Sequence, residues 1–348
     1  MNTLNWATIL PLVFMGVMGL ALMIYVVLDG YDLGVGILLP FATDAEKDVM
    51  VSSIGPFWDA NETWLVLGIG VLLICFPLAH GVVLSALYLP VTLMLVGLTL
   101  RGVSFDFRVK ARDEHKRAWN NAFSIGSLLA AMAQGWMLGS YLTGFSSSGL
   151  SLAFSLGIAL TLPTAYAMLG AGWLIMKTGD SLKQKAVRWA RAVLWPMGVA
   201  LVGISVATPI VSPTVFDKWF SLPQLLGLLP IPLACGVAFF AILQVISKPR
   251  VVAAGYGWVV FAGTVLIFLM AFLGLAYSIY PYVVLDRLTV WQAASATEAL
   301  VVIGIGVAIT LPAIIIYTIF MYRVFWGRAQ ALSYGTTAGP GPVASSGH

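Results

Sequence analysis

Runs of about twenty apolar residues recur along this chain and constrain its fold more than any other feature. A helix needs about 20 such residues to cross the roughly 30 Å hydrocarbon core of a bilayer. The chain is 60% hydrophobic and only 9% charged. We therefore predict an all-α integral membrane protein with about nine transmembrane helices, or eight or ten if one of the weaker segments is misassigned. The predicted spans are 7–28 (continuing as far as 39), 62–79, 82–100, 119–142, 152–176, 190–211, 225–246, 256–280 and 297–321.

The order of these spans indicates one polytopic membrane domain, 1–332. We predict two four-helix bundles, 1–142 and 152–280, followed by a ninth helix at 297–321. Residues 333–348 are small and rich in Gly, Pro and Ser, which is typical of a flexible tail.

Small residues four apart let membrane helices approach closely, as at Gly30/Gly34 and Gly135/Gly139. Such pairs are common in membrane helices. We expect these two to pack helices within the chain rather than to form a dimer interface.

Positive charge predicts how the chain is oriented. Loops on the cytoplasmic side of membrane proteins carry an excess of Lys and Arg. Sixteen of the eighteen basic residues fall in alternate loops or at the ends of spans facing them, and only Lys218 and Arg287 fall on the other side. This places the N-terminus outside and the C-terminus in the cytoplasm. The net charge of +4 is then explained by topology, and we expect no nucleic-acid partner.

Acidic residues cluster where the first predicted span ends and the second begins. Asp29 and Asp32 form one pair at i,i+3 spacing, and Asp59 and Glu62 form the other. Placing a carboxylate in lipid costs on the order of 3 kcal/mol of free energy, so such groups are usually paired, in contact with water, or functional. The linker 40–56 is short, so the two pairs should be neighbours that hold and release a proton. The alternative is that they are solvated helix caps, Asp59 above all.

The residues that usually bind metals and haem are scarce. A haem within a bilayer usually takes axial His or Met ligands from the helices. The three histidines are His80, His115 and His348, and none lies in the middle of a predicted span. Cys75 and Cys235 form no CxxC pair. We therefore expect this chain to bind no haem and no metal.

Three stretches carry a specific resemblance. Residues 28–36 (LDGYDLGVG), 56–64 (PFWDANETW) and 101–108 (RGVSFDFR) resemble subunit II of the cytochrome bd family of quinol oxidases. Residues 172–178 and the region from Tyr280 to Tyr322 extend the likeness over nearly the whole chain, with detail closer to the cyanide-insensitive branch. One departure is Ala60, where the family usually has glycine, and its extra methyl narrows any water path beside Asp59.

The resemblance implies a function for the whole complex. Subunit II of this family is a haem-free partner of subunit I, which carries two b-type haems, a third haem of d or b type, and the quinol site. Together they oxidise quinol and reduce oxygen to water in the bacterial inner membrane. We consider two further kinds of partner: small single-helix accessory subunits, and a quinone or lipid bound in this subunit. A proton-coupled secondary transporter, which also needs buried acids, is the alternative function.

The resemblance also assigns roles to residues. Acids matching Asp29, Asp32, Asp59 and Asp106, with the base matching Lys110, are proposed in this family to line a proton route from the cytoplasm. We add Glu62 to this route. Asp59 and Asp106 are expected to act as relays, and Asp29 and Asp32 as a shared proton-collecting mouth; Asp106 has the alternative role of an ion pair that holds its loop. The supporting residues are predicted to be Trp58, Asn61, Trp64, Arg101 and Arg108.

Overall fold

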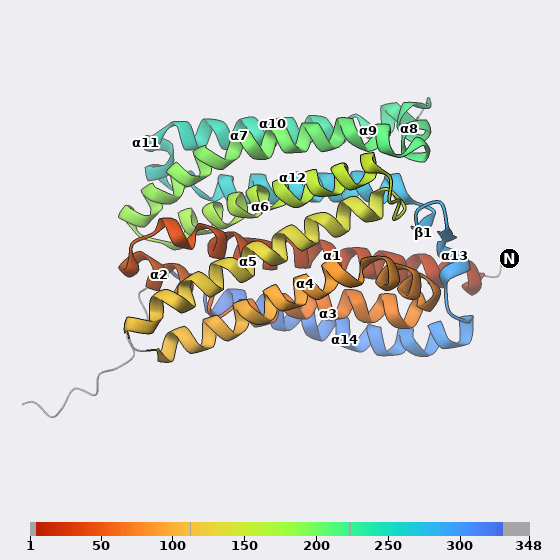
Figure 1. Cartoon of the computed structure of the whole chain (residues 1–348), viewed down its shortest axis with the longest axis horizontal. Coiled ribbons are helices and arrows are strands. Elements are labelled where there is room, and N and C mark those ends of the chain that lie inside the picture. The colour runs from red at the N-terminus through yellow and green to blue at the C-terminus, as the bar shows by residue number, and fades with distance from the viewer. Residues whose placement is uncertain (1–4, 112, 223, 330–348) are drawn as a thin grey trace, which may run out of the picture.

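The chain forms a bundle of long helices lying side by side in the computed structural model (Figure 1). The structure describes residues 5–111, 113–222 and 224–329; the predicted tail 333–348 lies outside them. Nine helices of this described part are long and apolar enough to cross a membrane, which confirms the predicted fold class. They are α1 (Trp6–Leu38), α3 (Trp58–Cys75), α4 (Pro77–Lys110), α5 (Asp113–Leu142), α6 (Gly149–Lys177), α7 (Asp180–Val211), α10 (Pro230–Ser247), α12 (Trp258–Ile279) and α14 (Thr297–Val324).

Short elements connect the long helices at both ends of the bundle (Figure 1). The helical ones are η1 (Leu39–Phe41), α2 (Asp44–Ile54), α8 (Pro213–Phe220), α9 (Gln224–Leu228), α11 (Pro249–Val251), η2 (Val252–Tyr256) and α13 (Val290–Ala293). Strands β1 (Tyr282–Val284) and β2 (Leu288–Thr289) pair antiparallel at the end opposite to α2 and α11.

Two segments expected as loops are helical. Residues 101–110 continue α4 without a break, and α2 occupies most of the linker 40–56. The predicted spans stopped at charged residues, but a helix propagates through them because its backbone bonds do not depend on apolar side chains. A capping box begins α2, with the Thr43 backbone N–H donating to Glu46 at 2.7 Å. Lys185 of α7 also donates to Glu46 at 2.7 Å, and these bonds hold the pKa of that carboxyl below its ordinary value.

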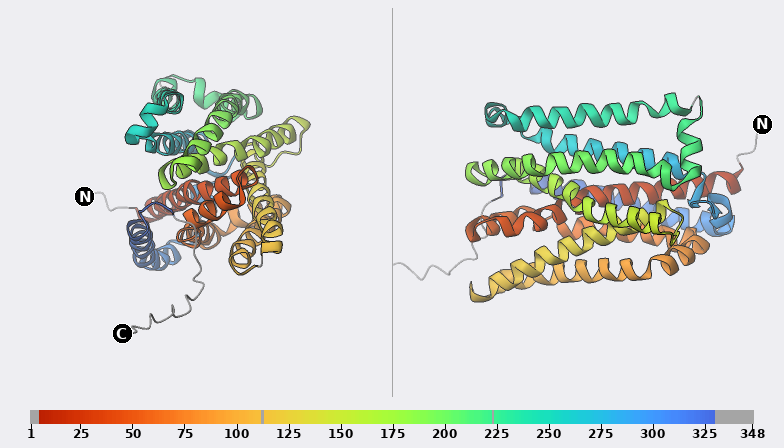
Figure 2. Two further views of the ribbon diagram at one scale, coloured as in Figure 1. Left: turned by 90° about the vertical axis from the view of Figure 1, so that its left-hand side faces the viewer. Right: turned by 45° about the horizontal axis from the view of Figure 1, so that its top comes forward.

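Helices α1 and α6 form the centre of the bundle. Helix α1 packs against α3, α5, α6 and α14, while α6 packs against α1, α5, α7 and α12. In Figure 2, α3, α4, α5 and α14 gather on one side of this centre, and α7, α10 and α12 gather on the other. The buried core runs continuously across the boundary, from Tyr31 of α1 to Trp173 of α6. That each group of four is a separate bundle stays a prediction.

Glycines bring α1 and α6 into backbone contact. A Cβ atom added at Gly34 would collide with the carbonyl oxygen of Tyr166, and one added at Gly170 would collide with the Gly34 backbone. One at Gly30 would lie 2.9 Å from the Tyr166 ring. On α5, Gly135 and Gly139 approach α6 in the same way. Both GxxxG pairs therefore serve contacts within the chain, as expected.

We predict that Gly34→Ala destabilises the protein by about 1–3 kcal/mol, as is usual for overpacking. The backbone atoms that the new methyl group meets cannot rotate away as a side chain would. Gly16→Ala is the matched control on the same helix, because a Cβ at Gly16 meets nothing within 4 Å. Thermal unfolding of the detergent-solubilised protein measures both variants. Equal unfolding temperatures would contradict the close contact.

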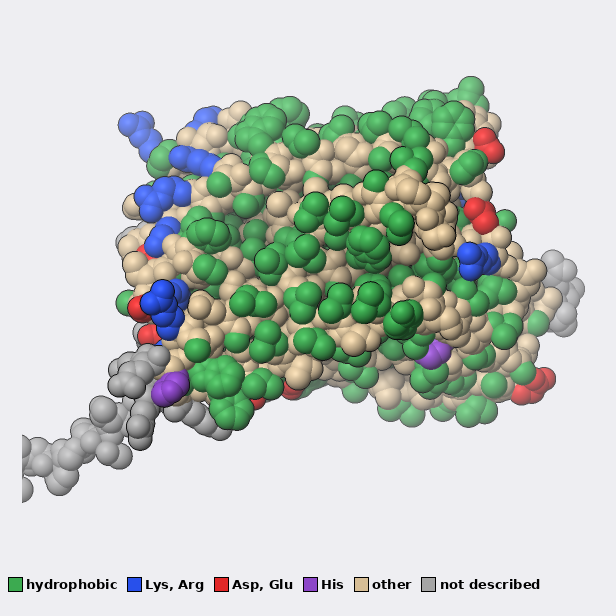
Figure 3. All heavy atoms as spheres, in the orientation of Figure 1, with side chains coloured by type: hydrophobic (Ala, Val, Ile, Leu, Met, Phe, Trp, Pro, Cys, Tyr) green, Lys and Arg blue, Asp and Glu red, His purple; other side chains and the backbone are tan. Residues whose placement is uncertain are grey.

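Basic side chains gather at one end of the bundle (Figure 3). This end, which we call the basic end, is where α1, α6 and α14 finish and where α3 begins. Apolar side chains cover the middle of the face shown, and acidic ones dominate the opposite end. This distribution is the one expected from the positive-inside rule. The orientation of the chain across the membrane stays a prediction.

Candidate functional site

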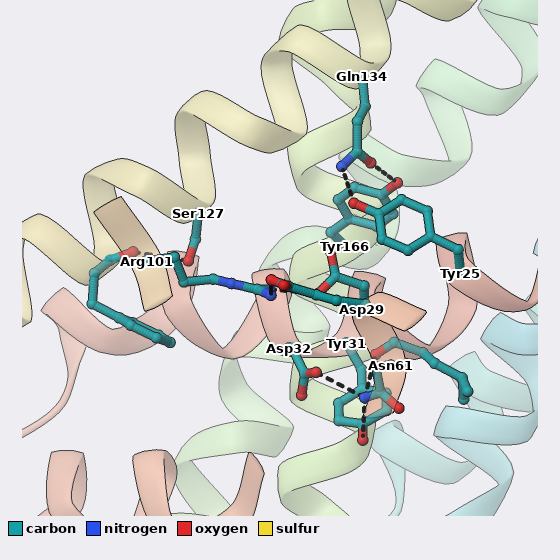
Figure 4. Close-up of polar contacts among 12 residues, drawn as sticks. Tyr25, Asp29, Tyr31, Asp32, Asn61, Arg101, Ser127, Gln134 and Tyr166 are labelled. Atoms are coloured by element: carbon teal, nitrogen blue, oxygen red, sulfur yellow. Dashed lines mark hydrogen bonds and ion pairs between the residues drawn. The ribbon is translucent and has the colours of Figure 1, made fainter. Parts of the chain in front are cut away.

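A buried arginine joins three helices inside the bundle. Arg101 of α4 is only 1% exposed, and its guanidinium pairs with Asp29 of α1 at 2.5 Å (Figure 4). Its second terminal nitrogen pairs with Glu62 of α3, a half-buried carboxylate. Asp29 and Glu62 were predicted to belong to a proton route and Arg101 to support it, and these contacts bring the three together. We call Asp29, Asp32, Glu62 and Arg101 the carboxylate cluster.

The cluster lies deeper than the sequence suggested. Helix α1 continues to Leu38, so Asp29 lies inside it, roughly 13 Å from its end at 1.5 Å per residue. Asp29 and Asp32 are both fully buried. Their position inside the helix means that its C-terminal dipole has little effect on them, because that effect is confined to the last turn.

A second set of hydrogen bonds surrounds Asp32. The amide of Asn61 donates to Asp32 at 2.8 Å and to the Tyr31 hydroxyl at 3.0 Å. Tyr322 of α14 donates to the amide oxygen of Asn61 at 3.1 Å, and the Tyr31 and Tyr322 hydroxyls lie 2.6 Å apart. Asn61 therefore links α1, α3 and α14, and it is fully buried as a support should be.

A third polar group lies one turn further along α1, toward the end opposite to the basic end. Gln134 of α5 donates to the Tyr25 hydroxyl at 2.9 Å and accepts from the Tyr166 hydroxyl at 2.5 Å (Figure 4). Tyr25 precedes Asp29 by four residues, so both lie on the same face of α1. Buried polar groups thus extend from the carboxylate cluster toward the middle of the bundle.

The carboxylate cluster holds more acid than base. Arg101 supplies one positive charge, whereas Asp29, Asp32 and Glu62 supply up to three negative ones. Oδ2 of Asp29 and Oδ1 of Asp32 are buried and have no hydrogen-bond partner among the described residues. Buried charges without partners are strongly disfavoured, and a bound proton removes one. The arrangement can therefore hold an exchangeable proton.

The other predicted proton-path residues lie at the basic end. Asp59 is exposed in the first turn of α3, and Asp106 is exposed near the end of α4. Neither carboxylate has an ion-pair partner in the part of the chain that the structure describes, so the ion pair considered for Asp106 is not seen. Lys110 ends α4, and its side chain lies outside what the structure describes.

The remaining predicted supports pack around the cluster. Trp58 lies against Phe105, and both line a narrow gap that also touches Asp32 and Arg101. Trp64 is 2% exposed and packs beside α1.

Arg108 ties three helices together at the basic end of α4. It donates to Asp48 of α2 at 2.7 Å and to Asn120 of α5 at 2.5 Å. Ala60, the departure from the family pattern, is buried, so its methyl group faces protein rather than a water path.

The two described histidines lie near the ends of their helices. His80 lies in the first turn of α4 at the end opposite to the basic end, and His115 lies exposed in the first turn of α5. Both are far from the middle of their helices. In the described part of the chain, no three His, Cys, Asp or Glu residues are placed to hold a metal ion.

Sequence reasoning missed the tyrosines and the glutamine that extend the site. Tyr31 lay within a motif but drew no attention, and Tyr322 lay at the end of the last span. Gln134 is a polar amide within an apolar run, which in a membrane helix is a signal for an interhelical hydrogen bond. This signal was present in the sequence and could have identified Gln134.

Comparisons with known proteins identify relatives over almost the whole chain. The chain is 28% identical to the cytochrome bd ubiquinol oxidase subunit 2 of Bacillus subtilis, covering 93% of this chain and 96% of that protein. It is 26% identical to the cytochrome bd-I ubiquinol oxidase subunit 2 of Escherichia coli, covering 89% and 92%. Its fold matches a chain in the structure of the bd oxidase from Geobacillus thermodenitrificans with a TM-score of 0.73, at 18% identity over 91% and 98% of the two chains.

The sequence profile of the family described as cytochrome bd terminal oxidase subunit II matches residues 10–325. The match spans all nine membrane helices almost completely, together with the carboxylate cluster and its hydrogen-bonded neighbours. The chain belongs to the cytochrome bd terminal oxidase subunit II family.

Proposed function

We propose that this chain is the haem-free subunit II of a cytochrome bd-type oxidase, in which it stabilises subunit I and conducts protons from the cytoplasm toward the oxygen-reducing site. The chain is a multi-pass protein of the bacterial inner membrane. The complex would oxidise quinol and reduce oxygen to water, as the names of its relatives indicate. The family match favours this function over that of a proton-coupled transporter.

One observation carries the proposal for proton conduction: two carboxyl groups, Asp29 and Glu62, pair with a single buried guanidinium, and a third, Asp32, lines the same gap. A site with equal numbers of acids and bases would be a structural ion-pair network. Here the surplus carboxyl groups have unpartnered oxygens, and the pairing with Arg101 keeps them close together without neutralising all of them. Such a site gains and loses a proton with little movement of side chains.

The proposed route begins at the basic end and runs inward. Asp59 and Asp106 are exposed there and would collect protons from water. The protons would then reach Asp32 and Asp29, which lie roughly two turns inside the end of α1. Tyr25, beside Gln134, would be the next hydroxyl on the route. Arg101 would position the carboxylates without itself changing protonation, since a guanidinium stays charged.

Subunit I would hold the haems, whose chemistry is electron transfer and oxygen reduction. The placement of His80 and His115 at helix ends supports this division. This chain would contribute helices that pack against subunit I and stabilise it, together with carboxyl groups that hold a proton.

The test is the oxygen consumption of the purified complex with quinol, normalised to its haem content. Asp32→Asn keeps the size of the side chain and can still accept from Asn61, but it cannot carry a proton. We expect turnover to fall about tenfold, less than the roughly hundredfold that losing an essential proton-transfer group causes, because Asp29 and Glu62 remain, while haem content and yield stay near wild type.

Two further sets of variants complete this test. Asp59→Asn and Asp106→Asn should lower turnover only two- to threefold, because water and neighbouring acids replace an exposed carboxylate. Asp286→Asn is the control, since Asp286 lies exposed in the β1–β2 turn at the other end of the bundle. Wild-type turnover in Asp32→Asn, at unchanged haem content, would refute the proposed proton route.

A further inference from the structure

A cleft of about 370 Å³ lies at the basic end of the bundle. It is bounded by the α2–α3 junction, by the last residue of α6 and by the chain that follows α14. Its lining combines cations, hydroxyls and aromatic rings, including Lys177, Arg328, Ser52, Ser53, Phe57 and Phe325. None of the described residues that line it is acidic. The proposed function uses none of these side chains.

The ammonium group of Lys177 is not neutralised by any acid among the residues that the structure describes. Its three N–H bonds are directed to the carbonyl oxygens of Phe325, Trp326 and Gly327, at 2.8, 2.9 and 3.2 Å. The rings of Phe57, Trp173 and Trp326 surround it at 5.1–5.3 Å. All of these partners are uncharged, and among the described residues no carboxylate pairs with Lys177. Its positive field therefore extends into the cleft.

Arg328 supplies the hydrogen-bond donors that Lys177 no longer has. Its side chain is exposed and makes no ion pair with any described residue. A bond of 2.8 Å from the backbone N–H of Ala329 to the carbonyl of Lys177 holds this part of the chain against α6. The planar guanidinium, with five N–H donors, suits a phosphate group, which accepts two parallel hydrogen bonds from it.

The apolar part of the lining indicates which phosphate fits. Phe57, Val324 and Phe325 form one side of the cleft, and Trp326 is exposed beside it, as aromatic residues are at the level of lipid headgroups. Basic pockets at the cytoplasmic ends of membrane helices bind lipid headgroups. We propose that this cleft binds the phosphate headgroup of an anionic phospholipid, with Arg328 donating to the phosphate and the aromatic side holding the glycerol backbone and the first acyl carbons.

The proposal is tested on the complex purified from membranes in detergent. Phosphatidylglycerol is added in increasing amounts, and native mass spectrometry counts the lipids that stay bound; phosphatidylcholine is the zwitterionic comparison. We expect one phosphatidylglycerol bound more tightly than the rest. Arg328→Gln should weaken that binding about tenfold, the change that follows from losing a charge-assisted hydrogen bond of about 1.4 kcal/mol.

Arg323→Gln is the matched control, because Arg323 is equally exposed in the last turn of α14 but does not line the cleft. It should leave the tight binding unchanged. Three results would overturn the proposal: equal weakening by both variants, equal retention of phosphatidylcholine, or displacement of the lipid by millimolar inorganic phosphate, which has no acyl part. Tighter binding after removal of residues 333–348 would instead assign the cleft to the chain's own tail.

Discussion

Arg101→Gln is expected to lower the yield and the unfolding temperature of the complex more than any other single change discussed here. The substitution leaves Asp29 fully buried and Glu62 half-buried without their common cation. Removing one partner of a buried ion pair costs about 3–5 kcal/mol, because the remaining charge stays out of water. Native proteins are stable by only about 5–15 kcal/mol, so this loss is a large share of the total.

The neutralised triple variant Arg101→Gln, Asp29→Asn, Glu62→Gln separates charge from shape. It removes the unpaired carboxylates together with the arginine, and we expect it to recover much of the lost unfolding temperature without recovering turnover. Arg108→Gln is the comparison, with a smaller expected effect, because the side chain of its partner Asp48 is 39% exposed and water can solvate it. If Arg101→Gln and Arg108→Gln had equal unfolding temperatures, the buried ion pairs of Arg101 would stabilise the protein no more than the partly exposed pair of Arg108 does.

The second large effect concerns turnover, measured on the complex that still assembles with haem, because removing both ion-pair partners of Arg101 also lowers the unfolding temperature. We expect Asp29→Asn combined with Glu62→Gln to reduce haem-normalised oxygen consumption by about a hundredfold, the lower range for removal of a proton-transferring group. The double variant removes both ion-pair partners of Arg101 and leaves Asp32 as the one carboxylate of the carboxylate cluster. The cluster then no longer has more carboxyl groups than cations. Each single variant should retain more activity, because the other carboxylate still accompanies Asp32.

The single and double variants together form a cycle that shows whether the two acids act jointly. Neighbours that share one task give effects that do not add, whereas independent residues give effects that do. Oxygen consumption is measured over a range of pH, and the profile of the double variant should differ in shape from that of wild type because titrating groups have been removed. A double variant as active as wild type, with the same pH profile, would leave these acids with a purely structural role.

The sequence predicted the membrane helices well because their cause is local. The length and apolar character of a segment suffice to place it across a bilayer, and all nine predicted spans overlap observed helices. The acids of the two motifs were also identified correctly as neighbours, since Asp29 and Glu62 meet on Arg101.

What the sequence could not predict was depth. Arg101 was assigned to a loop because charged residues follow it, yet it lies inside α4, where it pairs with two carboxylates. The expected order of the acids is also reversed in depth: Asp29 and Asp32 are buried, while Asp59 and Asp106 face outward. Burial depends on which faces of α1, α3 and α4 meet, and contacts between helices distant in sequence are not encoded in any one segment.

The hydrogen bond between Tyr31 and Tyr322 joins residues 291 positions apart in the chain. Among the described long helices, α1 is synthesised first and α14 last. During synthesis, Asn61 therefore cannot accept its hydrogen bond from Tyr322 until α14 has entered the membrane. A chain released early would keep the ion pairs of Arg101 but would leave the Asn61 amide oxygen unbonded in the membrane interior. The polar centre of this protein is thus completed only after α14 has been synthesised and has packed against α1 and α3.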